Sequence, residues 1–205
     1  MRTSHTQSVE NAVISRIYGR GRGSVFTPKD FLDLGSRQSV GVALHRLTKN
    51  GKIRSLARGL YDYPKTSELL GSLAPSMEAT AKALAGAESL RLQPSGAYAA
   101  NLLGLSEQVP AKVVYLTDAR SRMVHVGRQT IVLKQTTARN LRLHARLCGL
   151  VVQALRYLGR KHVGEEQIAT LRRQFTPEQR QEILADAKWA PSWIAEIIRA
   201  IAREN

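Results

Sequence analysis

The segment SRQSVGVALHRLTKNGKIRSLARGLYDYP, residues 36–64, decides the fold of the first third of the chain. Its first half carries apolar residues at positions i, i+3, i+4 and i+7, which is the spacing of one helix face. These residues are Val40, Ala43, Leu44 and Leu47. Ser36 is suited to cap this helix, and Gly51 is suited to end it. The second half alternates basic and apolar residues around Arg58-Gly59, which predicts two short strands of a hairpin.

The residues before this segment predict two further helices. Apolar residues recur at helical spacing from Val9 to Tyr18, and the glycines of GRGRGS (19–24) end that pattern. Thr27-Pro28 is typical of an N-cap followed by proline in the first helical position, and the short helix that follows stops at Gly35. The predicted order is therefore three helices and a hairpin, which is the order of a winged helix-turn-helix domain.

The third predicted helix, residues 36–50, has a second face opposite its apolar stripe. Short, polar and basic side chains occupy that face and its flanks. They are Arg37, Gln38, Gly41, Val42, His45, Arg46 and Lys49. Such a face suits the DNA major groove, because arginine binds guanine edges or phosphate, glutamine pairs with adenine, and valine meets the thymine methyl group. An ordinary solvated helix face is the alternative, and the position of this helix before a basic hairpin favours DNA binding.

The hairpin and the glycine-rich segment supply further cations. Lys52, Arg54 and Arg58 are expected to contact phosphates from the hairpin, residues 52–63. Arg20 and Arg22 are either contacts to the DNA backbone or members of a solvated turn. GRGRGS follows a predicted helix and lacks a Gly-Lys-Ser/Thr ending, so it does not indicate a nucleotide-binding loop.

The charge balance agrees with a polyanionic partner. The 205 residues include 31 Lys and Arg against 16 Asp and Glu, a net charge of +15. This excess indicates DNA, RNA or an anionic membrane surface as partner. Residues 1–65 hold 12 basic and 4 acidic groups, more than half of the net charge. No apolar run approaches the ~20 residues of a membrane span and no signal peptide is evident, so we expect a cytoplasmic protein without membrane association.

The remainder of the chain predicts two further domains. Residues 66–140 contain an Ala-rich helix (77–87), a loop and short helix (92–105), and three strands. The strands are expected at 112–118, 122–127 and 129–135, with Gly127-Arg128 as a hairpin turn between the last two. Residues 141–205 predict helices, including one that begins after Thr176-Pro177 and one that begins after Pro191. The expected fold class is α+β: a winged helix (1–65), a small α+β domain with antiparallel strands (66–140) and a helical C-terminal region (141–205).

The sequence offers little for catalysis. A nucleotidyltransferase needs a Gly-Ser pair and two carboxylates at D-x-D spacing to hold magnesium, and Gly35-Ser36 has no such partner. The five histidines have no metal-ligand spacing, and the single cysteine, Cys148, is expected to be a buried thiol. We therefore expect neither enzymatic activity nor a cofactor.

Two segments resemble one family of bacterial proteins. Residues 36–64, above all GLYDYPK (59–65), are similar to the N-terminal winged helix of the AbiEi-like antitoxins of abortive-infection (type IV) toxin–antitoxin systems. LQPSGAYAANLLGLSEQVPAKVVYLTD (92–118) resembles the signature region of their second domain. The resemblance covers about residues 10–135. It implies a repressor that binds repeats in its own promoter and counteracts a nucleotidyltransferase-like toxin without a stable complex.

Two functions are therefore under consideration. The first is a DNA-binding autorepressor that serves as the antitoxin of a toxin–antitoxin operon. The alternative is a stand-alone winged-helix regulator, or an RNA-binding module, without a toxin partner. Aromatic residues make up only 5% of the chain, which argues against recognition of single strands by base stacking. Inverted repeats in a promoter would require two protomers, so we expect a monomer or weak dimer that assembles on DNA.

Overall fold

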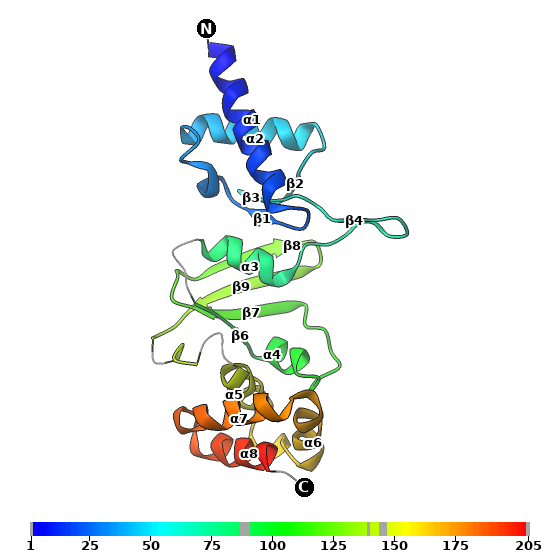
Figure 1. Ribbon diagram of the computed structural model, residues 1–205, viewed down its shortest axis with the longest axis vertical. Coiled ribbons are helices and arrows are strands. Elements are labelled where there is room, and N and C mark those ends of the chain that lie inside the picture. The colour runs from blue at the N-terminus through cyan, green and yellow to red at the C-terminus, as the bar shows by residue number, and fades with distance from the viewer. Residues whose placement is uncertain (1, 87–90, 139, 144–146, 204–205) are drawn as a thin grey trace. The chain divides into compact units, whose positions relative to one another are not determined.

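The computed structural model describes residues 2–86, 91–138, 140–143 and 147–203, with side chains from residue 8. The chain forms two compact units (Figure 1). The first comprises residues 1–88 and 125–127, and the second comprises residues 89–124 and 128–205. The predicted α+β fold class is confirmed. The sequence placed boundaries near residues 65 and 140, whereas the two units divide at residues 88 and 89.

The first unit is built around a winged helix. Its elements are α1 (Arg2–Arg20), β1 (Val25–Phe26), η1 (Pro28–Phe31), α2 (Arg37–Lys49), β2 (Arg54–Ala57), β3 (Leu60–Asp62), β4 (Thr66–Ser67), β5 (Gly71–Ser72) and α3 (Met77–Ala85). Strands β1, β3 and β2 form one antiparallel sheet in that order. The predicted second helix is one turn of 3₁₀ helix, η1, and the two-residue strand β1 was not predicted.

Helix α2 forms where the apolar spacing predicted it. The Ser36 hydroxyl accepts a hydrogen bond from Ser39 N at 3.1 Å, which satisfies one of the free N–H groups of the first turn. The four apolar residues of the predicted stripe are all buried, in a core shared with α1, β1 and η1. Gly51, at φ +66°, takes the left-handed conformation that ends the helix and turns the chain toward β2.

The hairpin β2–β3 is the wing. Arg54 lies opposite Asp62 and Ser55 opposite Tyr61, and an irregularity between Ser55 and Ala57 precedes the turn. Gly59 occupies the turn at φ +71°. Leu60 is buried, so the inner side of the wing is anchored to the unit while its turn is open to solvent.

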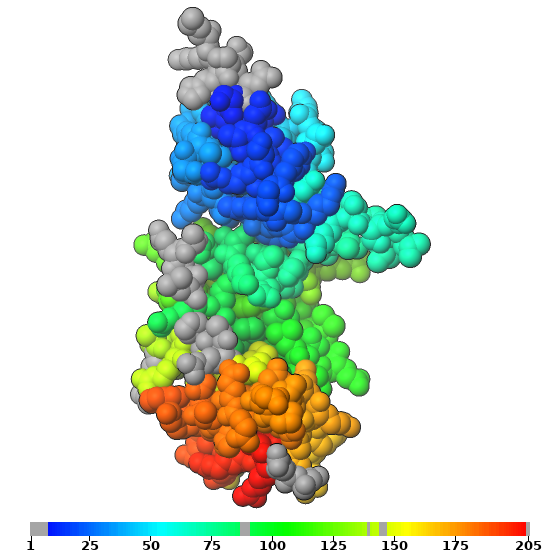
Figure 2. All heavy atoms as spheres, viewed as in Figure 1, coloured from blue at the N-terminus to red at the C-terminus, as the bar shows by residue number. Residues whose placement is uncertain are grey.

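A second hairpin, β4–β5, follows the wing and was not predicted. Its turn carries Leu69 and Leu70, which are 94% and 77% exposed. Arg54 fixes the end of the hairpin by donating to Ser72 Oγ at 3.2 Å and to Leu73 O at 2.8 Å. Figure 2 shows this teal hairpin as a projection from the first unit.

The second unit combines a sheet with a helical core. Its elements are β6 (Leu92–Ser95), α4 (Ala97–Leu102), β7 (Lys112–Thr117), β8 (Arg122–Val126), β9 (Gln129–Gln135), α5 (Leu147–Leu158), η2 (Arg160–His162), α6 (Glu165–Gln174), α7 (Pro177–Asp186), η3 (Ala187–Trp189) and α8 (Ser192–Ala202). Residues 125 and 126 of β8 belong to the first unit, and the strand order is β6-β7-β9-β8.

The middle sheet departs from the prediction in one strand and one pairing. Residues 92–95, expected as part of a loop, form β6 and pair with β7 in the antiparallel sense, whereas β7 and β9 are parallel. β8 lies at the edge, and Gly127, at φ +59°, begins the two-residue turn that leads from β8 into β9. The chain therefore crosses from β7 to the far edge and returns between the two strands, which brings β9 beside β7 in the same direction.

The helices α4 to α8 enclose the core of the second unit. Cys148, the single cysteine of the chain, is buried in this core, as predicted. Thr176 accepts a hydrogen bond from Gln179 N at 3.3 Å and caps α7, and Pro191 precedes α8; both helix starts are confirmed. The sequence predicted a helix from Leu141, but residues 141–143 form a turn and the described helix α5 begins at Leu147; residues 144–146 lie outside the described residues. No helix in the described ranges combines the length and apolar character of a membrane span.

Candidate nucleic-acid interface

One face of the first unit presents polar side chains that have no partner among the described residues. We call it the open basic surface: it comprises the outward face of α2 and the exposed residues that follow it to the tip of the wing. Its charged and polar members are Arg37, Gln38, His45, Lys49, Lys52 and Arg58. All six are exposed, and none forms a side-chain hydrogen bond or ion pair with another described residue. Their donors are therefore available to an external anion.

The middle of the α2 face is sterically open. Val42 is 38% exposed, an apolar side chain among polar neighbours. A Cβ atom added to Gly41 would meet no atom within 4 Å, so another molecule can approach the helix backbone at this residue. Gly41 and Val42 are thus accessible on this face of α2, and their contact with DNA stays a prediction.

Arg46 differs from its neighbours on α2. Its Nη1 lies 3.6 Å from Glu10 Oε2 on α1. This pairing links the two helices and partly neutralises the guanidinium, although half of the side chain is exposed. Arg46 is therefore less available to a ligand than Arg37 or Lys49.

Arg54, predicted as a wing cation, is engaged inside its own unit. Its Nε donates to Asp62 Oδ1 at 3.0 Å and its Nη2 to Asp62 Oδ2 at 2.6 Å, while Asp62 is only 1% exposed. These hydrogen bonds from Arg54 to Asp62 raise the pKa of Arg54 above its ordinary value. The bonds to Asp62 lie within the wing and those to Ser72 and Leu73 reach the second hairpin, so most of the guanidinium donors are engaged inside the first unit.

Arg20 and Arg22 are also engaged. Arg20 Nη1 lies 3.1 Å from Asp30 Oδ1, and its guanidinium lies 5.4 Å from the centre of the Phe31 ring. Arg22 Nη1 donates to Pro64 O at 3.1 Å, with its guanidinium 4.7 Å from the centre of the Tyr63 ring. Arg20 therefore fastens the end of α1 to η1, and Arg22 fastens the following turn to the segment after β3.

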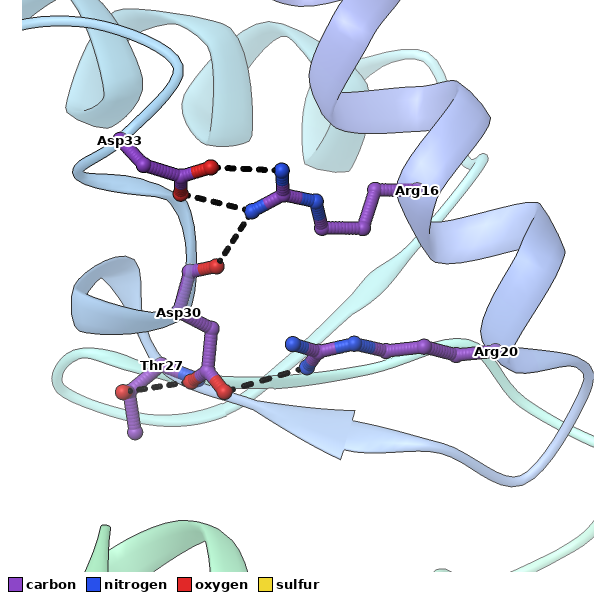
Figure 3. Close-up of polar contacts among 5 residues, drawn as sticks. All are labelled: Arg16, Arg20, Thr27, Asp30 and Asp33. Carbon is purple, nitrogen blue, oxygen red and sulfur yellow. Dashed lines mark hydrogen bonds and ion pairs between the residues drawn. The ribbon is translucent and has the colours of Figure 1, made fainter. Parts of the chain in front are cut away.

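Figure 3 shows how α1 holds the turn before α2. Arg16 forms two hydrogen bonds to the Asp33 carboxylate, both at 2.7 Å, and one to Asp30 O at 3.1 Å. Asp30 Oδ2 accepts from the N–H and the hydroxyl of Thr27. The hydrogen bonds from Arg16 lower the pKa of Asp33 below its ordinary value. This network fixes η1 and thereby the start of α2.

Lys29 is a candidate that the sequence analysis missed. It is exposed on η1, and its side chain has no partner among the described residues. The sequence feature that could have indicated Lys29 is its place just after Thr27-Pro28, in the first turn of the predicted second helix. Phosphates bind readily near helix N-termini. The described residues contain no group of three or more His, Cys, Asp or Glu side chains that could hold a metal ion.

The first unit is therefore a winged helix whose α2 face and wing tip present cations without a partner in the described part of the chain. The chain belongs to a family of unknown function, DUF6088, whose model matches residues 12–183. The comparison with curated proteins found no match. Among solved structures, the chain is similar to the crystal structure of the RV2827C protein from Mycobacterium tuberculosis. The two share 15% sequence identity and a TM-score of 0.46 over 98% of this chain and 83% of that chain.

Proposed function

We propose that this protein binds double-stranded DNA by placing α2 in the major groove and the wing tip against the phosphate backbone. The observation that carries the proposal is the contrast between paired and unpaired cations. Arg20, Arg22 and Arg54 are engaged within the unit, whereas Arg37 and Arg58 have no partner among the described residues. Unpaired cations around an exposed helix face suit a polyanion that is read through its grooves.

The two ends of the open basic surface suit different contacts. Arg37 and Gln38 occupy the first turn of α2, where side chains can reach base edges. A bidentate contact to guanine or adenine discriminates against the wrong base by about 1–3 kcal/mol. Arg58 lies in the wing turn and suits a phosphate, which contributes affinity without sequence information.

We further propose that the bound DNA is the protein's own promoter and that the protein is the antitoxin of a toxin–antitoxin operon. The resemblance of residues 36–64 and 92–118 to the AbiEi-like antitoxins supports this role. Repeats in the promoter would be bound by two copies, which assemble on the DNA. The functional partner would be a nucleotidyltransferase-like toxin that forms no stable complex with this chain.

The decisive experiment compares three labelled probes by fluorescence anisotropy at several salt concentrations. The probes are a duplex from the region upstream of the gene, a shuffled duplex of equal length, and a structured RNA of similar size. The proposal expects the promoter duplex to bind best and the salt dependence to be steep. Equal affinity for promoter and shuffled DNA would exclude sequence-specific repression, and a preference for RNA would favour the RNA-binding alternative.

Three variants separate the contacts. Arg58→Ala should weaken binding to both duplexes and reduce the salt slope by about one unit. Gln38→Ala should instead reduce the preference for the promoter over the shuffled duplex. Arg128→Ala removes an exposed arginine of the second unit and is the matched control for lost charge. If Arg128→Ala weakens DNA binding as much as Arg58→Ala, the assignment of the contact to the wing is wrong.

The antitoxin role has its own test. A nucleotidyltransferase-like gene next to this one should inhibit growth when expressed alone and should be tolerated when expressed with this chain. If co-expression gives no protection, the stand-alone regulator becomes the better proposal. That result would leave the DNA-binding experiment unaffected.

A further inference from the structure

The second unit contains a cavity of about 240 Å³ beside α5. It is bounded by β6, by residues 140–143, by α5 and by the turn between η3 and α8. All of these segments belong to the second unit, so the cavity is independent of the open basic surface.

The residues around Gly149 in the cavity lining are closely packed. Gly149 on α5 has no room for a side chain, because an added Cβ would collide with the carbonyl oxygen of Leu143 and with the amide of Gln93. With its amide in the orientation that satisfies both ends, Gln93 donates to Leu143 O and accepts from Leu150 N, each at 3.3 Å. These contacts hold residues 140–143 against α5 and keep the cavity wall in place.

The cavity wall offers hydrogen-bond donors and positive charge. Gln153 is 8% exposed, and its Oε1 accepts from Ser95 Oγ at 3.1 Å. Its amide N–H groups have no partner among the described residues, and Gln153 is one of the residues that line the cavity. Arg142 and Arg156 add two guanidinium groups, and neither forms an ion pair with a described residue. No acidic side chain contributes to the described lining.

Trp189 orders one of these guanidinium groups. The Arg142 guanidinium lies 4.4 Å from the centre of the Trp189 ring, and Lys188 Nζ lies 5.5 Å from the same ring. Stacking on indole limits the orientations of Arg142 without consuming its N–H donors. Asp186, a buried carboxylate, lines an adjoining cavity that shares Arg142, Leu143 and Trp189 with this one, but it is absent from the lining of this cavity.

We propose that this cavity binds the phosphate group of a small phosphorylated ligand, a sugar phosphate or nucleotide. Two guanidinium groups and the amide donor of Gln153 match the several acceptor oxygens and the double charge of a phosphate monoester. A carboxylate offers only two oxygens and one negative charge, so it would leave more of the N–H donors of Arg142, Arg156 and Gln153 without an acceptor than a phosphate would. The cavity accommodates a phosphate and part of the attached sugar, with the rest of a larger ligand outside its mouth.

The test uses the full-length protein and ribose 5-phosphate as the first probe, at constant ionic strength. Binding is followed by calorimetry and by tryptophan fluorescence, because a ligand that engages Arg142 changes the surroundings of Trp189. AMP is the second probe, and adenosine and succinate supply a base without phosphate and a dicarboxylate without phosphate. We expect saturable binding of the two phosphates at one site per chain and much weaker binding of the other two compounds.

Two substitutions locate the site. Arg156→Gln and Arg142→Gln should each weaken ribose 5-phosphate binding by about tenfold or more, since each removes a charged donor. Arg128→Gln loses the same charge from an exposed turn and should bind like the wild type. Circular dichroism checks that each variant is folded, and Arg156 is exposed, so its loss should not disturb the fold.

Several results would overturn the proposal. Absence of saturable phosphate binding, or equal weakening in all three variants, would show only the general attraction of a chain with net charge +15. Equal affinity for succinate would indicate a carboxylate ligand instead. Loss of duplex-DNA affinity in Arg156→Gln, without ribose 5-phosphate binding, would assign the arginine to a nucleic-acid backbone.

Discussion

The Arg54–Asp62 pair gives a quantitative test of how the wing is held. Arg54 makes two hydrogen bonds to a carboxylate that is 1% exposed, while 34% of the Arg54 side chain remains accessible. Removing one member of a buried pair costs about 3–5 kcal/mol, because the other charge is left buried. The partial exposure of Arg54 lowers this figure, and we expect Arg54→Met to destabilise the first unit by about 2–3 kcal/mol. For a unit of this size the melting temperature should fall by about 10–20 °C.

The assay can separate the two units because both tryptophans, Trp189 and Trp193, lie in the second. Urea unfolding followed by far-UV circular dichroism reports both units, whereas tryptophan fluorescence reports the second directly. We expect Arg54→Met to lower the midpoint of the circular-dichroism component that fluorescence does not detect. Arg58→Met is the control, because Arg58 is exposed and has no partner among the described residues.

A double variant decides whether the buried charge causes the loss. In Arg54→Met/Asp62→Leu the carboxylate is absent, so most of the stability should return. A loss below about 1 kcal/mol in the single variant would refute the reasoning that Asp62 depends on Arg54. The reasoning would fail equally if the double variant were no more stable than the single one.

Three further predictions follow from individual contacts. Arg16 keeps the pKa of Asp33 below its ordinary value of 3.8. The pair therefore stabilises the folded state at pH values above 3.8, and this stabilisation is lost as the pH falls through the lowered pKa. In Asp33→Asn, the stability measured by circular dichroism should depend less steeply on pH in this acid range. Gly149→Ala should destabilise the second unit by about 1–3 kcal/mol through collision with Leu143, seen as a lower urea midpoint in tryptophan fluorescence. Gly59→Ala should cost about 1 kcal/mol, because φ is +71° there, and should lower the thermal midpoint of the first unit; an unchanged midpoint would contradict the left-handed turn.

Local patterns predicted the winged helix well. The apolar spacing from Val40 to Leu47 corresponds to α2, and the turn residues Gly51 and Gly59 correspond to the two chain reversals that follow. These features depend on neighbours within a few residues, so the sequence contains their causes directly. The two-residue strand β1 has no such pattern, since it exists through pairing with β3 at Asp62 and Tyr61.

The middle sheet was harder for a physical reason. Pro94 lies inside β6, and proline in a run argues against a strand because it cannot donate to a ladder. β6 is an edge strand, where a proline is tolerated. Either strand of the β8–β9 hairpin could pair with β7. In the structure β9 does so, which makes the pairing parallel, and no nearby residue encodes that choice.

The open basic surface was predictable only in part. Sequence alone treats every arginine of the first unit as available, because it shows charges without their partners. Arg22 reaches Pro64, 42 residues away, and Arg54 reaches Asp62 across the wing. Arg37 and Arg58 have no such partners among the described residues, and folding alone reveals the difference.

The proline in β6 has a consequence for how the molecule behaves at high concentration. The outer side of an edge strand can recruit a strand from another molecule and begin an aggregate. β6 is four residues long and one of them is Pro94, so this edge offers little backbone for a foreign strand to pair with. Pro94→Thr would lengthen the run of N–H groups, and we expect the variant to form intermolecular sheet on storage while the parent chain stays dispersed.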